Sequence, residues 1–88
     1  MTDEKQLKAY RAAGELFGRL EEALGFGQLT MHMDARVFVF SWGFNAKGKA
    51  YGSQLHIDKD DIVFGCDVAD LATRTAKRWK ADHKKLTE

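Results

Sequence analysis

Two short segments, "MHMD" and "LHID", carry metal-ligand side chains at the same spacing. They place His32 two residues before Asp34, and His56 two residues before Asp58. Imidazole nitrogens and carboxylate oxygens are ligands that zinc and similar divalent ions accept. In the strand register derived below, an aromatic ring separates the two histidines, and their backbones lie about 9.6 Å, two strand spacings, apart. We therefore interpret both histidines as the polar border of an apolar face and expect no metal or other cofactor.

The other residues suited to catalysis lack the partners that catalysis needs. Cys66 is the only cysteine, and no histidine stands near it in sequence to act as its base. The acid pairs Asp60–Asp61 and Asp67–Asp70 stand where helices are expected to begin, so capping and the helix dipole explain them. The sequence contains no glycine-rich phosphate loop and no nucleophile elbow. We predict a protein that is not an enzyme and has no catalytic residues.

Basic residues gather in the last predicted helix and in one hairpin loop. A basic stripe on a helix can bind phosphate groups. Cations near a helix C-terminus also complement the helix dipole, and a charged outer face is usual. The net charge of +1 gives no overall attraction to nucleic acid or to a membrane surface. Nucleic acid is therefore the less favoured partner, and its candidate contacts are Arg74, Lys77, Lys80, Lys84, Lys47 and Lys49.

The segment "RVFVFSWGF" is a predicted strand with apolar residues on both faces. Alternation places Val37 and Val39 on one side and Phe38, Phe40 and Trp42 on the other. A strand in a two-layer domain needs only one apolar face, because the other meets water. One of the two sets must therefore face the core, and the other is a candidate interaction surface.

The loop after this strand predicts which set is outside. Residues 45–48 predict a type I turn with Gly48 in the left-handed region and a bulge. That geometry pairs Phe40 with Gln54 and Phe38 with His56. The aromatic face then has polar neighbours, as an outer face would.

The preceding loop, residues 34–36, also places the aromatics outside if it has three residues, because the polar His32 then lies beside Phe38. A two-residue loop at Asp34-Ala35 reverses the faces and makes the aromatics core. We prefer the longer loop because Asp-Ala is a poor type I′ turn. The expected interaction face is Phe38, Phe40, Trp42, His32, His56 and Gln54.

Periodicity defines the elements that position these residues. We expect helices at 2–25 and 68–86, strands at 28–33, 37–43 and 51–57, and a helical turn or short fourth strand at 62–64. The predicted fold is α+β, a single two-layer domain over residues 1–88 in the order α-β-β-β-α. It has a three-stranded antiparallel sheet with both helices on one face. Gly14 and Gly18 in the first helix indicate either a close helix–helix contact or sheet aromatics packed over them.

This element order resembles that of double-stranded-RNA-binding domains. The resemblance covers most of the chain but concerns element order alone. That family carries a proline–histidine loop between strands and a lysine cluster at the start of the second helix. This chain has no proline, and its lysines lie toward the end of that helix. The resemblance therefore implies no site residues.

With 88 residues, 44% of them hydrophobic, the chain is expected to form one small globular domain. We expect a cytoplasmic location from the single cysteine and no membrane partner, because no long apolar run is present. The predicted function is a protein-interaction module whose aromatic face forms a homodimer or binds another protein. Small phage or mobile-element accessory proteins and inhibitors, including anti-CRISPR proteins, are analogous in size and lack of cofactors. The alternative is a single-stranded nucleic-acid-binding protein that stacks bases on the aromatics.

Overall fold

A computed structural model of the chain describes residues 4–34 and 36–87, with side chains as far as Lys85. Residues 2 and 3, expected in the first helix, lie outside this part. The elements are α1 (Glu4–Leu24), β1 (Gln28–Asp34), β2 (Val37–Ala46), β3 (Lys49–Asp58), the π-helical turn η1 (Asp61–Gly65) and α2 (Val68–Thr87).

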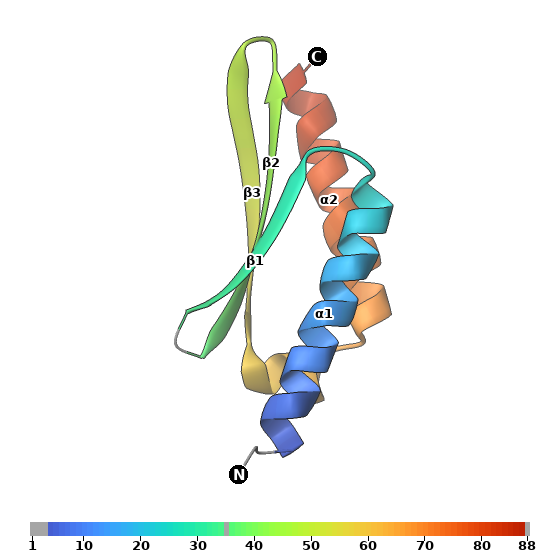
Figure 1. Ribbon diagram of the computed structural model, residues 1–88. Helices are drawn as coiled ribbons and strands as arrows, with labels where there is room; N and C mark the ends of the chain where they lie inside the picture. Colours follow the sequence, from blue (N-terminus) through green and yellow to red (C-terminus); the bar gives the residue numbers. More distant parts are fainter. Residues whose placement is uncertain (1–3, 35, 88) are drawn as a thin grey trace.

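The strands form one antiparallel sheet in the order β1-β2-β3, with β2 in the centre. Figure 1 shows α1 and α2 on the same side of this sheet, running side by side in the same direction. The Cα atoms span 49 × 23 × 17 Å, so the molecule is long and thin. The predicted order α-β-β-β-α and the antiparallel sheet are confirmed.

The helices form where apolar spacing and capping groups direct them. The buried residues of α1 recur at three- and four-residue intervals, as in Ala9, Ala13, Leu16 and Leu20. Gly25 ends this helix at a φ of 72°, a region that glycine adopts without strain. At the start of α2, the carboxylate of Asp67 accepts a hydrogen bond of 3.2 Å from the backbone N–H of Asp70.

The turn between β2 and β3 differs from the prediction and shifts the register by one residue. Lys47 and Gly48 both have positive φ, 52° and 76°, so two residues alone make the turn, as in type I′ hairpins. Ala46 consequently pairs with Lys49, and the ladder continues to the end of both strands without a bulge. The predicted type I turn with a bulge is wrong, because a lysine adopts the left-handed conformation that we assigned to glycine alone.

The connection between β1 and β2 is also shorter than predicted. Asp34 pairs with Val37, and the ladder then places Met31 opposite Phe40 and His32 opposite Val39. The predicted three-residue loop is therefore wrong. The alternative two-residue loop at Asp34-Ala35 has the observed length but begins one residue too early, because Asp34 is still paired. A register shift of one residue moves every side chain of a strand to the other face.

The core lies between the sheet and the two helices and contains the aromatic side of β2. The largest fully buried side chains are Trp42, Phe38, Phe40, Leu16, Leu20 and Ile62. On the opposite face of β2 only Val39 is buried, and Val37, Ser41 and Gly43 are half-buried. Trp79 of α2 is buried in the same core.

Candidate functional site

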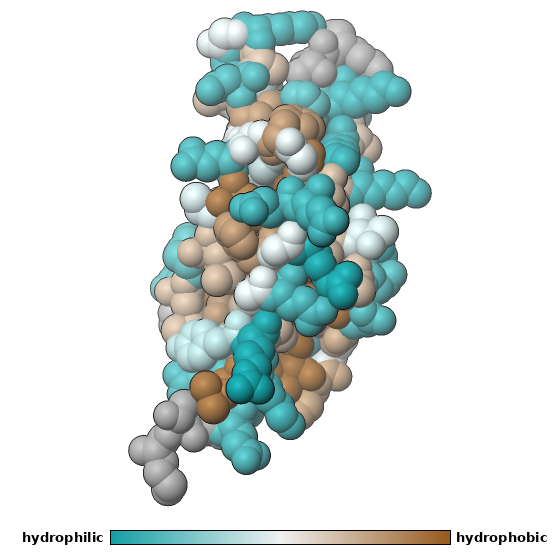
Figure 2. All heavy atoms as spheres, turned by 45° about the vertical axis from the view of Figure 1, so that its right-hand side comes forward, coloured by the Kyte–Doolittle hydropathy of each residue, from teal (hydrophilic) through white to brown (hydrophobic). Residues whose placement is uncertain are grey.

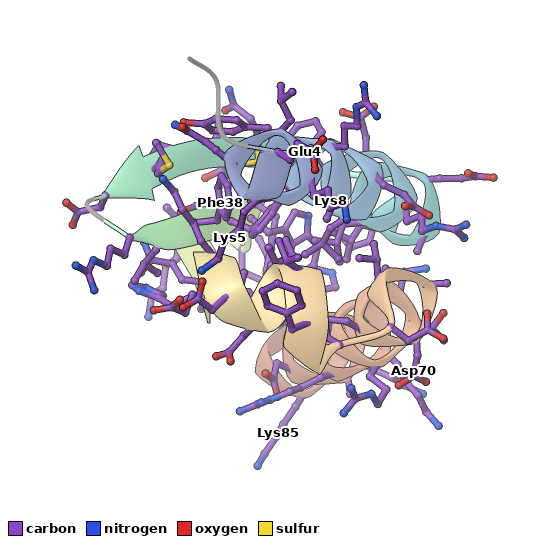
Figure 3. All side chains as sticks on the ribbon, turned by 90° about the horizontal axis from the view of Figure 1, so that it is seen from below. Glu4, Lys5, Lys8, Phe38, Asp70 and Lys85 are labelled. Atoms are coloured by element: carbon purple, nitrogen blue, oxygen red, sulfur yellow. The ribbon has the colours of Figure 1, made fainter. Side chains whose placement is uncertain are left out.

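The predicted aromatic interaction face is part of the core. Phe38, Phe40 and Trp42 expose 1% of their surface or less. Figure 3 shows Phe38 between α1 and the strands. The prediction that these three side chains form an exposed outer face is wrong, because they lie under the two helices that cover this side of the sheet (Figure 1).

The buried aromatics contact one another and the helices. The ring of Trp42 stacks on that of Trp79 at 5.9 Å between centroids and an interplanar angle of 4°. The indole Nε1 of Trp42 donates a 2.9 Å hydrogen bond to the backbone oxygen of Phe26. Tyr10 meets Phe38 edge to face at 5.9 Å. These contacts hold both helices and the α1–β1 connection on the sheet.

His32, His56 and Gln54 lie on the opposite, outer face of the sheet. Both histidines pair with Val39, one from each side, so their backbones are about 9.6 Å apart across the central strand. The Nε2 atom of His56 lies 3.1 Å from Oε1 of Gln54, and Gln54 donates a 3.3 Å hydrogen bond to Ser41. Within the described part of the chain, no three metal-ligating side chains come together.

A shallow depression of about 680 Å³ lies on the same outer face, over Gly43 and Gly52. Its other lining residues are Gln28, Thr30, Ser41, Trp42, Ser53 and Gln54. Because this lining contains amides and hydroxyls but no ionisable side chain, it offers no general acid or base.

Exposed apolar side chains gather instead where α1 lies beside β1. Leu7 and Tyr10 of α1 expose 43% and 41% of their surface, and Met31 and Met33 of β1 each expose 40%. We call the surface formed by these four residues and the free edge of β1 the α1–β1 side. Figure 2, in which the right-hand side of Figure 1 comes forward, shows hydrophobic atoms between hydrophilic ones from the upper third of the molecule to its lower end. Exposed apolar groups gathered on one side of a small domain are typical of an interaction surface.

The free edge of β1 carries little of the usual protection against strand pairing, since its one charged side chain is Asp34 at the end of the strand. Its seven residues, QLTMHMD, include no lysine, arginine or proline, and its ladder with β2 has no bulge. Exposed edges normally carry at least one of these features, because unpaired backbone groups accept a further strand.

The edge formed by β3 differs, because α2 borders it. Arg78 and Asp82 of α2 line a groove together with Ser53 and Leu55 of β3. Charged side chains therefore stand beside the edge of β3, whereas the side chains beside the edge of β1 are mostly apolar, with Glu21 of α1 as a charged exception near Leu29.

Most candidate nucleic-acid contacts lie at the end of the molecule where the β2–β3 turn meets the C-terminal half of α2 (Figure 1). Figure 3 shows Lys85 extending outward from α2. Arg74 lies apart from this end and forms an ion pair of 2.8 Å with Asp70. Asp82 is the only acid among the described side chains of this half of α2. We call this region the basic end, and it comprises Lys47, Lys49, Lys77, Arg78, Lys80, Lys84 and Lys85.

Cys66, the one thiol, is poorly suited to act as a nucleophile. Burial raises its pKa, and the negative charges of Asp67 and Asp61 raise it further, against a smaller opposing effect of Arg74. The thiolate is the reactive form, so a raised pKa lowers reactivity at neutral pH.

Comparisons with protein-family models, with curated proteins and with solved structures gave no match for this chain. Among the described residues, neither helix is long and apolar enough to span a membrane.

The α1–β1 side was missed at the sequence level. Alternation within β1 places Leu29, Met31 and Met33 together, but the predicted register assigned this set to the covered core. The available signal was the composition of this strand, which has no charged residue before Asp34.

Proposed function

We propose that this protein is a non-enzymatic interaction module that binds an extended strand at the α1–β1 side. The observation that carries this proposal is that a β1 edge without lysine, arginine, proline or a bulge coincides with exposed Met31, Met33, Leu7 and Tyr10. Backbone hydrogen bonds to a free edge supply affinity, and apolar contacts on one face of the added strand supply specificity. The analogy with phage accessory proteins and inhibitors stays part of the proposal at the level of the class.

A displayed library of random peptides, panned against dilute protein, tests this function. We expect enriched peptides with apolar residues at every second position, because one face of the added strand contacts the methionines. Met31→Lys adds a charge to the β1 edge and is expected to weaken their binding by about tenfold or more.

Gln54→Lys is the matched control, since it adds the same charge to the exposed outer face of the β3 edge strand. Its peptide binding is expected to equal that of the unmodified protein. The proposal fails if no peptide is enriched, or if both variants bind the enriched peptides equally well.

The basic end supports a second candidate function, binding of a nucleic-acid backbone. Its cations are Lys47, Lys49, Lys77, Arg78, Lys80, Lys84 and Lys85, which stand against Asp82. Phosphate binding releases counterions, so oligonucleotide affinity is expected to fall by roughly 10³-fold or more between low and moderate salt if about six phosphates are contacted. A double Lys77→Glu/Lys80→Glu variant should bind a labelled oligonucleotide weakly, while Lys8→Glu on α1 should not change binding. Affinity that is insensitive to salt would exclude this function.

A further inference from the structure

We infer that the strand bound at the α1–β1 side is β1 of a second copy, in antiparallel register centred on Met31. The two sheets would then join into one six-stranded sheet with all four helices on the same face. This inference rests on the proposed function and names its partner.

The sequence of β1 complements itself in this register. Met31 faces Met31 of the second copy, and Leu29 faces Met33, so the apolar side chains meet on the helix-covered face. On the outer face Thr30 meets His32, and Gln28 meets Asp34. No like charges stand opposite each other, because the two Asp34 carboxylates lie about 20 Å apart at opposite ends of the seam.

Contacts within one chain show which part of α1 lies beside the centre of β1. Toward one end, Tyr10 contacts Phe38, which pairs with Met33. Toward the other end, Glu21 borders the same cavity as Leu29. Met31 stands midway between Met33 and Leu29, so the middle of α1 lies beside it.

The symmetry axis through Met31 therefore also passes the middle of α1. The two α1 helices become antiparallel neighbours, and Tyr10, Gly14, Phe17 and Glu21 are spaced to share the flank of α1 nearest β1. Gly14 of one copy then lies opposite Phe17 of the other.

Charges on the two helices are complementary in this arrangement. Arg11 stands near one end of the seam and Glu21 near the other, so each Arg11 approaches Glu21 of the second copy. Neither residue forms an ion pair of 4.0 Å or less among those the structure gives for the described side chains. Opposite charges meeting across a symmetric seam favour a second copy over an unrelated strand.

The glycines of α1 acquire a role from this packing. Gly14 and Gly18 are exposed, and a Cβ atom built on either meets nothing within 4 Å. The predicted contact with sheet aromatics is therefore wrong. Strands lie about 4.8 Å apart whereas helices pack at about 8–10 Å, so helices on a joined sheet are crowded at the seam. Because Gly14 and Gly18 carry no side chain, they would let the two α1 helices of the dimer approach each other at the seam.

The size of this side suffices for a stable dimer. The 21 residues of α1 make it about 32 Å long. Its width lies between the two shorter extents of the molecule, 23 and 17 Å. The contact is thus on the order of 600 Å² per copy, at the lower limit of standard specific interfaces.

Sedimentation equilibrium over a concentration series, combined with a charge exchange, tests the inference. The unmodified protein is expected to dimerise. Arg11→Glu and Glu21→Arg should each weaken the dimer by about tenfold, and the double variant should recover most of this loss. Lys8→Glu, on another face of α1, is the matched control and should leave the dimer unchanged. Circular dichroism verifies that every variant is folded.

Any of three outcomes would overturn the inference. The first is a protein that stays monomeric up to millimolar concentration. The others are a dimer that is insensitive to both single charge changes, and a double variant that recovers none of the lost dimer affinity. A monomer that still selects alternating peptides leaves the proposed function standing and removes only the second copy as partner. A monomer that selects none removes both.

Discussion

Phe40 lies between Met31 and Leu55 in the central strand, with no exposed surface. Phe40→Asp would place a carboxylate among apolar side chains, and this cost is expected to exceed about 4 kcal/mol. A small domain has little more stability than that. The variant should therefore lack native circular dichroism at 25 °C. Phe64→Asp, at a side chain that is 75% exposed, is the control and should stay folded. A folded Phe40→Asp protein would refute the observed register.

Cys66 predicts a specific alkaline dependence of stability. Burial, Asp67 and Asp61 raise its pKa in the folded protein above the ordinary value of 9.0. The unfolded chain therefore ionises first as the pH rises, and the folded state loses relative stability above pH 9.0, up to the folded pKa. Well below pH 9.0 the thiol is neutral in both states and contributes no dependence.

Urea unfolding between pH 8 and 10.5 measures this effect against Cys66→Ser, which lacks the titrating group. We expect the stability of the unmodified protein to decline more steeply than that of the variant. Alkylation should also be slower in the folded than in the urea-unfolded protein, since the thiolate reacts. Equal declines and equal alkylation rates would contradict the raised pKa.

The connection between α1 and β1 shows how a short segment controls the position of an element. Gly27 has a φ of 79°, and a Cβ atom there would lie 2.6 Å from Nε1 of Trp42 and 2.7 Å from the backbone oxygen of Gly43. Gly27→Ala must therefore displace backbone as well as side chain, and we expect a loss of about 3 kcal/mol or more of unfolding free energy.

Gly25→Ala is the matched control, because Gly25 has a similar φ of 72° but open space around it. It should cost only the strain of the left-handed region, about 1 kcal/mol. Chemical denaturation of both variants compares the two costs. Equal losses would mean that the close approach of Gly27 to Trp42 does not constrain the connection.

The helices and the order of the strands could be predicted, but the register could not. Helical spacing over 21 residues of α1 leaves few alternatives, and Asp67 marks the start of α2. The predicted register of each hairpin depended instead on how many residues its turn was assumed to contain. Lys47 in the left-handed region was not foreseen, because lysine rarely adopts it and the competing turn used glycine alone. One wrong residue in each turn then moved the aromatics from core to surface.

At the scale of the whole molecule, charge is distributed unevenly although the net charge is +1. The basic end gathers seven cations against Asp82, and the acids of β3, η1 and the start of α2 lie toward the other end. Net charge alone therefore understates the attraction of one end for anionic partners.

Gly14→Ala separates the stability of one chain from that of the assembly. Alanine at an exposed helical position without neighbours should stabilise the folded monomer by about 0.5–1 kcal/mol. The same methyl group should weaken the proposed dimer, because it would occupy the space into which Phe17 of the second copy packs. Urea unfolding at low concentration and sedimentation at high concentration measure the two effects. If both the unfolding free energy and the dimer affinity increased, the α1 helices would not meet at Gly14.

The long, thin shape also determines how the protein moves through solvent. A particle with extents of 49, 23 and 17 Å experiences more friction than a sphere of equal mass and tumbles anisotropically. Joining two such particles along their β1 edges adds width rather than length, and so gives a flat plate with a smaller axial ratio. Assembly would double the mass while raising the translational friction comparatively little. An end-to-end pair would do the opposite, producing a rod whose diffusion slows far more.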